Sequence, residues 1–197
     1  MNGGQALVGR LQHGFGFGND ADKLDAQDVF DVAQRQHFAV DHALGVVARE
    51  QQEFLDRLAA VDRALAARIG HRLFTILAYD PDTALATRLY SNLPDAYPAG
   101  GSKTVAQGPW TEAVLDRGEA YIGHTLDDLR QVFSDHALID SLGCQSVLNM
   151  PIRWRGRTLG SLNLLHAAHW YGPADAAACR PYAQLALPAV LPALLTL

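Results

Sequence analysis

Cysteine is scarce in this sequence of 197 residues, which contains only Cys144 and Cys179. Neither lies in a Cys-x-x-Cys pair, so the spacing indicates neither a zinc site nor the disulfide framework typical of small secreted proteins. We therefore expect reduced thiols and a cytoplasmic location.

The sequence also lacks an excess of positive charge and a long hydrophobic run. There are 16 Lys and Arg against 21 Asp and Glu, a formal net charge of −5, so we expect neither nucleic acid nor a membrane as a partner. Residues 1–18 contain no apolar run and do not resemble a secretory signal. The apolar segment 183–197 is too short to span a bilayer, and Pro188 and Pro192 interrupt it.

What is present points to one folded domain with an N-terminal extension. Hydrophobic residues make up 49% of the chain, enough for a substantial core, and charged residues 19%, few for a disordered chain. We expect residues 1–37 to form the extension, a flexible leader and a short helix capped by Asp25, and residues 38–197 to form the domain. The glycines of Gly14-Phe-Gly-Phe-Gly18 follow no predicted strand, so they do not predict a dinucleotide site.

A long helix is predicted over residues 38–69, with Gly70 ending it. Its seam positions repeat in alternating steps of four and three residues, with one polar member: Val40, Leu44, Val47, Gln51, Phe54, Leu58, Val61 and Leu65. This spacing is typical of a helix that pairs with another helix, which predicts a homodimer through residues 40–69. The stripe fits equally well a helix that packs on its own sheet.

Strand patterns follow this helix. Two hairpins are predicted, one from residues 73–79 and 84–90, the other from residues 145–152 and 158–166. A long irregular segment, residues 91–142, separates them. Within this segment we expect short helices at 109–116, 126–133 and 134–142 and a short strand at 120–122. A helix over 175–195, distorted or broken at Pro188, closes the chain.

This order predicts an α+β fold. An antiparallel sheet of five or six strands must bury one face, and the helices from the two ends of the chain can cover it. The short helices and loops of residues 91–142 then cover the other face. That arrangement leaves a cavity between the sheet and this segment, the kind of place where small ligands bind.

The second hairpin resembles a known family. Leu148-Asn-Met-Pro-Ile-Arg-Trp-Arg-Gly-Arg-Thr-Leu-Gly-Ser-Leu-Asn-Leu-Leu-His166 is similar to the C-terminal half of a GAF domain. In that family an apolar strand ending in Pro-Ile or Pro-Leu leads to a basic turn with glycine and then to Leu-Gly-x-Leu-Asn-Leu. Leu142-Gly-Cys-Gln-Ser146, residues 110–118 and the opening helix and hairpin also fit. The resemblance covers about residues 51–195 and is specific for fold rather than function.

GAF domains bind cyclic nucleotides, tetrapyrroles, amino acids, oxo-acids or haem, or serve only as dimer modules. The markers of the subclasses are missing here: there is no Cys-His pair for a bilin, no Asn-Lys-Phe-Asp motif for a cyclic nucleotide, and two cysteines instead of the three of the GAF-fold free methionine sulfoxide reductases. The resemblance therefore implies a sensory or regulatory protein for an unspecified small molecule, with no cofactor assigned. No output domain is recognised, so we expect it to act as a dimer or through a partner protein.

Two alternatives stay open. One is a cysteine-dependent redox enzyme acting on a small metabolite, with Cys144 as the redox group; the other is a dimerisation module whose cavity is filled. No Lys or Arg adjoins Cys144 in the sequence to lower its pKa, which favours an inert thiol. We predict no catalytic residue and no metal site, because His166 and His169 lack a further ligand at a recognised spacing.

Polar residues in the last predicted strand locate the floor of the cavity. Ser161 and Asn163 share one face of that strand, and a buried Asn must find hydrogen-bond partners. With a two-residue turn at Arg155-Gly156, Leu148 and Met150 share that face and Asn149 points to the other, although a register slip of one residue would reverse this. Leu148 and Met150 are expected to add an apolar lining.

The walls of the cavity are expected to come from the irregular segment, from Asn92, Tyr97, Lys103, Trp110 and Tyr121. Lys103 follows two glycines and a serine, whose backbone can approach an anion, so Lys103 or Arg88 is expected to meet any anionic group of a ligand. A simpler alternative accompanies these residues, namely that Lys103 is an exposed loop lysine and that the aromatic side chains pack in the core.

Overall fold

The structure of the protein is a computed structural model that describes residues 26–195, apart from the side chains of some residues near the two ends of this range. The predicted leader, the glycine cluster 14–18 and the Asp25 cap lie outside the described residues. Within them, no helix is both long enough and apolar enough to cross a membrane.

The N-terminal helix is one element, α2 (Ala26–Arg68), where the sequence predicted a short helix followed by a long one. The predicted break near residue 37 is wrong because neither glycine nor proline interrupts the chain there. The chain divides into two compact units, Met1–Ala48 and Arg49–Leu197, and the strands of the described residues all lie in the second.

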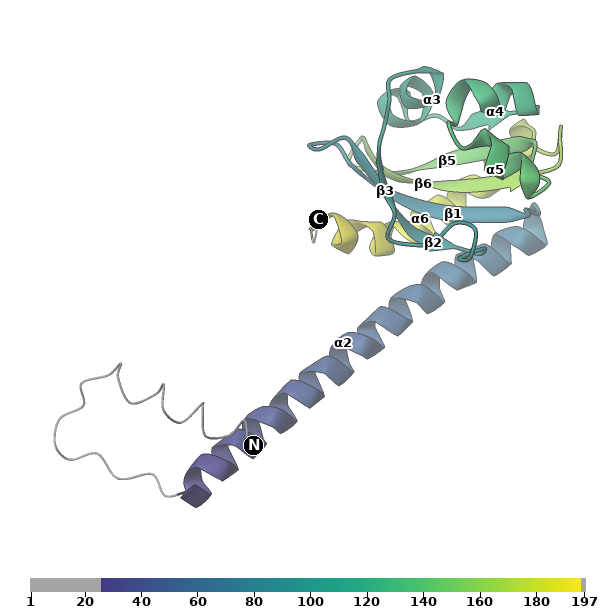
Figure 1. Cartoon of the computed structure of the whole chain (residues 1–197). Helices are drawn as coiled ribbons and strands as arrows, with labels where there is room; N and C mark the ends of the chain where they lie inside the picture. Colours follow the sequence, from purple (N-terminus) through teal and green to yellow (C-terminus); the bar gives the residue numbers. More distant parts are fainter. Residues whose placement is uncertain (1–25, 196–197) are drawn as a thin grey trace. The chain divides into compact units, whose positions relative to one another are not determined.

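A six-stranded sheet forms the centre of the second unit, and every neighbouring pair of strands is antiparallel. The strand order is β3-β2-β1-β6-β5-β4 (Figure 1). The strands are β1 (Leu73–Asp80), β2 (Leu85–Ser91), β3 (Ser102–Thr104), β4 (Tyr121–Gly123), β5 (Ser146–Trp154) and β6 (Arg157–His166). This architecture confirms the predicted α+β fold and both hairpins. Strand β3 was not predicted because its three exposed polar residues show no alternation.

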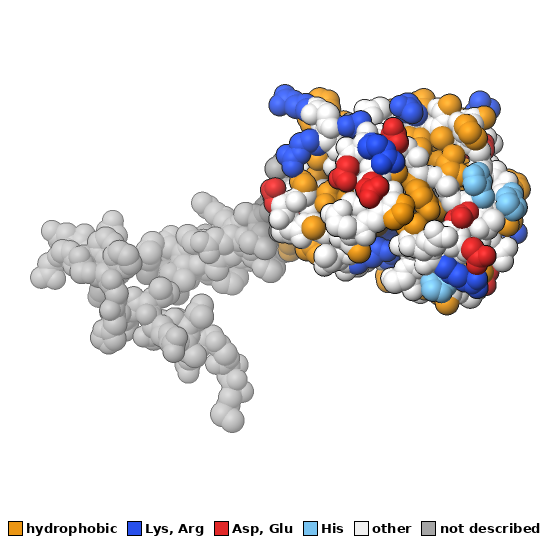
Figure 2. Space-filling model, turned by 90° about the horizontal axis from the view of Figure 1, so that it is seen from above, with side chains coloured by type: hydrophobic (Ala, Val, Ile, Leu, Met, Phe, Trp, Pro, Cys, Tyr) orange, Lys and Arg blue, Asp and Glu red, His pale blue; other side chains and the backbone are white. Residues whose placement is uncertain are grey.

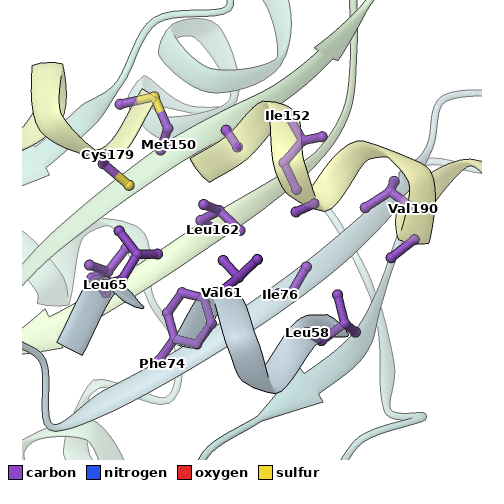
Figure 3. Close-up of a cluster of buried hydrophobic side chains, with 14 of the residues drawn as sticks. Leu58, Val61, Leu65, Phe74, Ile76, Met150, Ile152, Leu162, Cys179 and Val190 are labelled. Carbon is purple, nitrogen blue, oxygen red and sulfur yellow. The ribbon is translucent and has the colours of Figure 1, made fainter. Parts of the chain in front are cut away.

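The main hydrophobic core lies between one face of the sheet and two helices, the C-terminal half of α2 and the closing helix α6 (Pro173–Leu195) (Figure 3). Leu58, Val61 and Leu65 of α2 are buried against Phe74, Ile76 and Leu162 of the sheet. Helix α6 continues through Pro188, so no break occurs there. Burial of Ala186, Leu187 and Val190 on either side of that proline supports the helix where a hydrogen bond is lost.

Polar contacts also attach α2 to the sheet. The Tyr90 hydroxyl of β2 donates to Asp62 Oδ2 at 2.7 Å, and the His71 ring lies 2.6 Å from Asp62 Oδ1. Burial acts against the charged form of Asp62, but these hydrogen bonds outweigh it and lower the pKa of the carboxyl. Asp62 is therefore a charged anchor between the helix and strand β2.

The opposite face of the sheet is covered by short elements, as predicted (Figure 1). Helix α3 (Pro109–Thr111) continues as a wider π-helix, η2 (Glu112–Arg117), which ends at Gly118 in the left-handed conformation. Helices α4 (Leu126–Val132) and α5 (His136–Ser141) follow after β4. The sheet thus has one face packed by long helices and one face covered by short ones.

Gly160 allows strands β6 and β1 to pair closely. A Cβ atom added at Gly160 would lie 2.2 Å from the Leu77 carbonyl oxygen and 3.3 Å from a methyl group of Val190 in α6. Since the first contact is to backbone, no side-chain movement can relieve it. Glycine is therefore required here by close approach between the two central strands.

Replacing Gly160 by alanine is expected to lower the free energy of unfolding by at least about 1–3 kcal/mol, because the central strands must separate to admit the methyl group. Urea denaturation followed by circular dichroism measures the change. Gly108→Ala is the control: a Cβ atom there meets nothing within 4 Å, and a change within about 0.5 kcal/mol is expected. Equal urea midpoints for the two variants would contradict the packing argument.

Candidate functional site

A cavity of about 270 Å³ lies between the sheet and the segments that cover its second face. Its floor and one edge are formed by strand residues: Leu73, Thr75, Leu77, Ala86, Arg88, Asn149, Asn163 and Leu165. Its other sides are formed by Tyr97, Ile139 and the segments 103–111 and 131–135. Figure 2 views the molecule from the side of these covering segments, where charged side chains of both signs lie among hydrophobic ones.

The floor carries a connected set of polar side chains from three strands. Asn163 Oδ1 accepts hydrogen bonds from Asn149 Nδ2 at 2.6 Å and from the Ser161 hydroxyl at 2.9 Å. Asn163 Nδ2 donates to the Thr75 hydroxyl at 3.1 Å. The register explains these contacts, because Thr75, Asn163 and Asn149 are direct cross-strand neighbours on β1, β6 and β5. The buried amide of Asn163 is thus fully engaged within the floor.

Two sheet residues hold the helix that covers the cavity. The Trp110 indole N–H at the start of α3 donates to Asn149 Oδ1 at 3.1 Å. The Thr158 hydroxyl of β6 donates to the Val114 carbonyl of η2 at 2.8 Å. Trp110 therefore both lines the cavity and extends the polar floor to the covering helix.

Tyr97 connects the two sides of the cavity. Its hydroxyl donates to Asp135 Oδ2 at 2.8 Å, while the Arg88 guanidinium carbon lies 4.8 Å from the centre of its ring. Burial, reinforced by the hydrogen bond to the Asp135 carboxylate, raises the pKa of the Tyr97 phenol, which therefore stays protonated and acts as a donor.

Two charged groups of the lining have unused hydrogen-bonding atoms. Arg88 donates through Nη1 to the Pro98 carbonyl at 2.9 Å, but its buried Nε has no partner. Asp135 accepts the Tyr97 hydroxyl at one oxygen, but its buried Oδ1 has no partner. Lys103 is exposed at the edge of the cavity, with its ammonium group 5.9 Å from the centre of the Phe133 ring.

The fold around this cavity is shared with known proteins. No family model matches the sequence, and no curated protein matches it. Among solved structures, the GAF domain/HD domain protein from Geobacter sulfurreducens is similar at a TM-score of 0.58 and 12% identity, covering 74% of this chain and 97% of that one. The GAF domain of a two-component sensor histidine kinase from Bacillus halodurans is similar at 0.56 and 15% identity, covering 72% and 95%. This chain has a GAF-like fold.

The same fold occurs in an enzyme. The type II free methionine-R-sulfoxide reductase from Thermoplasma acidophilum is similar at a TM-score of 0.55 and 11% identity, with 71% of this chain and 94% of that one covered. Because a GAF-like fold is found in sensor and enzyme alike, the chemistry of the site has to be argued from its own residues.

The GAF-like fold brings together four of the seven predicted site residues: Tyr97, Lys103, Trp110 and Asn163 line the cavity, and so does Arg88. The other three lie elsewhere. Ser161 lies beside the floor and contacts it through Asn163. Asn92 bonds the backbone of Phe74 and Arg72 at the start of β1, and Tyr121 packs in a second hydrophobic cluster.

The predicted apolar lining by Leu148 and Met150 is wrong. Both side chains belong to the main core on the α2–α6 face of the sheet, and Asn149 between them points into the cavity. The predicted placement of Asn149 on the other face is wrong for the same reason: the pairing of β5 with β6 shifts by one residue between Ile152 and Arg153, so Asn149 rather than Leu148 lies opposite Asn163. The apolar lining comes instead from Leu73, Leu77 and Leu165.

Sequence reasoning missed Asp135 and Thr75 as lining residues. Asp135 lies directly before α5, where no sequence pattern connects it with the cavity, and Thr75 lies within an apolar strand without any local signal. The pairing of Thr75 with Asn163 follows from strand register, which the sequence alone does not set.

Neither cysteine lines the cavity. Cys144 is buried in the second hydrophobic cluster, and burial raises the pKa of its thiol. Cys179 is buried in the main core, and burial raises its pKa to about 12. Across residues 26–195, no three His, Cys, Asp or Glu side chains are grouped so that they can hold a metal ion. The His166 ring instead stacks on Trp170, with 3.6 Å between ring centres.

Replacing Asn163 by leucine is expected to lower the free energy of unfolding by about 1–3 kcal/mol, because the Asn149 amide and the Ser161 and Thr75 hydroxyls lose a buried partner. Urea denaturation measures it. Ser161→Ala removes one hydrogen bond and leaves the link between Asn163 and Asn149, so about 0.5–1.5 kcal/mol is expected. A leucine variant as stable as the unmodified protein would show that the floor network is dispensable.

Proposed function

We propose that this protein is a cytoplasmic sensory or regulatory protein that binds a small molecule in the cavity of its GAF-like domain and does not convert it. It acts as a homodimer or through a partner protein. The observation that carries the proposal is a cavity whose lining combines apolar strand residues with a few polar and charged groups from both layers.

Binding without turnover is supported by the composition of the lining. Its described residues include no histidine, the side chain most often used as general base, and no cysteine thiol. The Asn163 amide is engaged in structural hydrogen bonds, and the Tyr97 phenol is held protonated. The buried thiol of Cys144 lies in a different cluster, which argues against a cysteine-dependent redox reaction in this cavity.

A cavity-blocking variant tests ligand binding. Native mass spectrometry of freshly purified protein looks for a retained molecule, and a thermal-shift screen covers nucleotides, amino acids, oxo-acids and tetrapyrroles. A ligand present at 100 times its Kd raises the free energy of unfolding by about 2.7 kcal/mol. For a chain of this size, that raises Tm by roughly 5–10 °C.

Ala86→Phe places a ring in the cavity and should abolish that shift, whereas Leu185→Ser, on the exposed face of α6, should retain it. Melting each variant without ligand shows that it is folded. If Ala86→Phe retains the full shift, the ligand binds outside this cavity.

The homodimer part of the proposal rests on the exposed end of the α2 stripe. Leu44 and Val47 are 62% and 61% exposed, whereas Leu58 and Leu65 are 1% and 0% exposed because they pack on the sheet of their own chain. The C-terminal half of the stripe therefore packs within its own chain, and the exposure of Leu44 and Val47 supports pairing through the N-terminal half. We propose that the dimer forms through this N-terminal half of the predicted segment 40–69.

The double variant Leu44→Lys, Val47→Lys is expected to convert the dimer into monomers, because a lysine side chain resists burial in a helix–helix seam. Light scattering after size-exclusion chromatography at tens of micromolar gives the mass. Glu50→Lys, an exposed position of α2 outside the stripe, is the control and should remain dimeric. A monomeric unmodified protein at that concentration would refute the homodimer.

A further inference from the structure

We infer that the cavity binds a small zwitterion, whose anionic group contacts Arg88 and whose ammonium group contacts Asp135. The inference rests on the proposed function, since it names the class of molecule that the cavity accepts. Two buried atoms carry it, one on a cationic and one on an anionic side chain. Neither has a hydrogen-bond partner within the protein.

The first of these atoms is Arg88 Nε. The guanidinium is held in place from two directions, by the hydrogen bond from Nη1 to the Pro98 carbonyl and by the ring of Tyr97. Nε is buried and has no acceptor. A carboxylate binds an arginine best side-on, through Nε and a terminal nitrogen, and this is the acceptor that the fixed guanidinium lacks.

The second atom is Asp135 Oδ1. The carboxylate is oriented by the Tyr97 hydroxyl at Oδ2, which leaves Oδ1 buried without a donor. An ionised carboxylate accepts several hydrogen bonds, and its strongest partners are charged donors. An ammonium group therefore satisfies Oδ1 in charge as well as in hydrogen bonding.

Tyr97 keeps the two charged groups from neutralising each other. Its ring contacts Arg88 and its hydroxyl contacts Asp135, and the ion pairs found within 4.0 Å in the described chain do not include one between these two residues. A ligand that carries only an anion leaves Asp135 unsatisfied, and one that carries only a cation leaves Arg88 unsatisfied. A zwitterion satisfies both at once.

Size and lining define the rest of the molecule. A volume of about 270 Å³ lies just below the usual range for ligand pockets, so the molecule is small. Leu73, Ile139 and Leu165 offer an apolar surface beside the charged groups, while Asn163 and Asn149 are already bonded to each other. The zwitterion should therefore carry an apolar substituent.

Isothermal titration calorimetry on the full chain tests this with a panel of free amino acids. For each apolar member that binds, two analogues of the same shape are compared, the amine without the carboxylate and the carboxylic acid without the amine. We expect at least one zwitterion to bind and each analogue to bind at least 10-fold more weakly. If the panel gives no binding, or the analogues bind equally well, the inference is overturned.

Charge-removing variants assign the two contacts. Arg88→Gln and Asp135→Asn should each lower the affinity for the zwitterion at least 10-fold. Asp135→Asn should leave the affinity for the carboxylic acid analogue unchanged, and Arg88→Gln should leave the affinity for the amine unchanged. Asp127→Asn, an exposed carboxylate of α4, is the matched control and should change nothing. If both cavity variants bind the zwitterion normally, the contacts are wrong.

The failure of this inference is distinguishable from the failure of the proposed function. If a nucleotide, oxo-acid or tetrapyrrole stabilises the protein and Ala86→Phe abolishes the effect, the cavity binds a ligand that is not a zwitterion, and only the inference fails. If no compound of any class binds and no molecule is retained on purification, both fail.

Discussion

Asn163 lies at the centre of the sheet, and its amide contacts side chains from the strands on both sides. A buried amide has to satisfy its donor and its acceptor, and here it does so through Thr75 of β1 and Asn149 of β5. These bonds form only when the three strands pair in one register. Since Asn149 also receives the Trp110 N–H, the same constraint positions the helix that covers the cavity.

The two faces of the sheet have different roles: one holds the main core, and the other lines the cavity. The face toward α2 and α6 is apolar and closely packed, with Gly160 allowing the central strands to approach. The other face is polar at its centre and covered by short elements that leave space. An irregularity in the pairing of β1 with β2, between Ile76 and Leu77, separates two residues of β2 with different roles. On either side of it, Arg88 reaches the cavity and Tyr90 reaches Asp62 of α2.

The hairpins and the layering could be predicted because they depend on local patterns. Alternation in residues 145–166 predicts the strands, but it does not predict that Asn149 shares a face with Asn163, because a register shift between Ile152 and Arg153 decides this. The site could be predicted only in part, because its charged groups meet through tertiary contacts: Asp135 joins Tyr97 across 38 positions of the sequence. The α2 stripe shows the same limit, since a heptad-like spacing does not say whether its partner is a sheet or another helix.

The covering helix has a consequence for how molecules exchange with the cavity. Side chains of the sheet hold α3 and η2 at two points, through Trp110 and through the Val114 carbonyl. Opening the cavity by lifting this helix would break both hydrogen bonds together, one of them buried and the other part-buried. The neighbouring strand β3 has three exposed residues and lies at the edge of the sheet, so moving it breaks fewer buried interactions. Opening at this edge of the sheet therefore costs less free energy than lifting the helix, and the exposed Lys103 of β3 lines the cavity there.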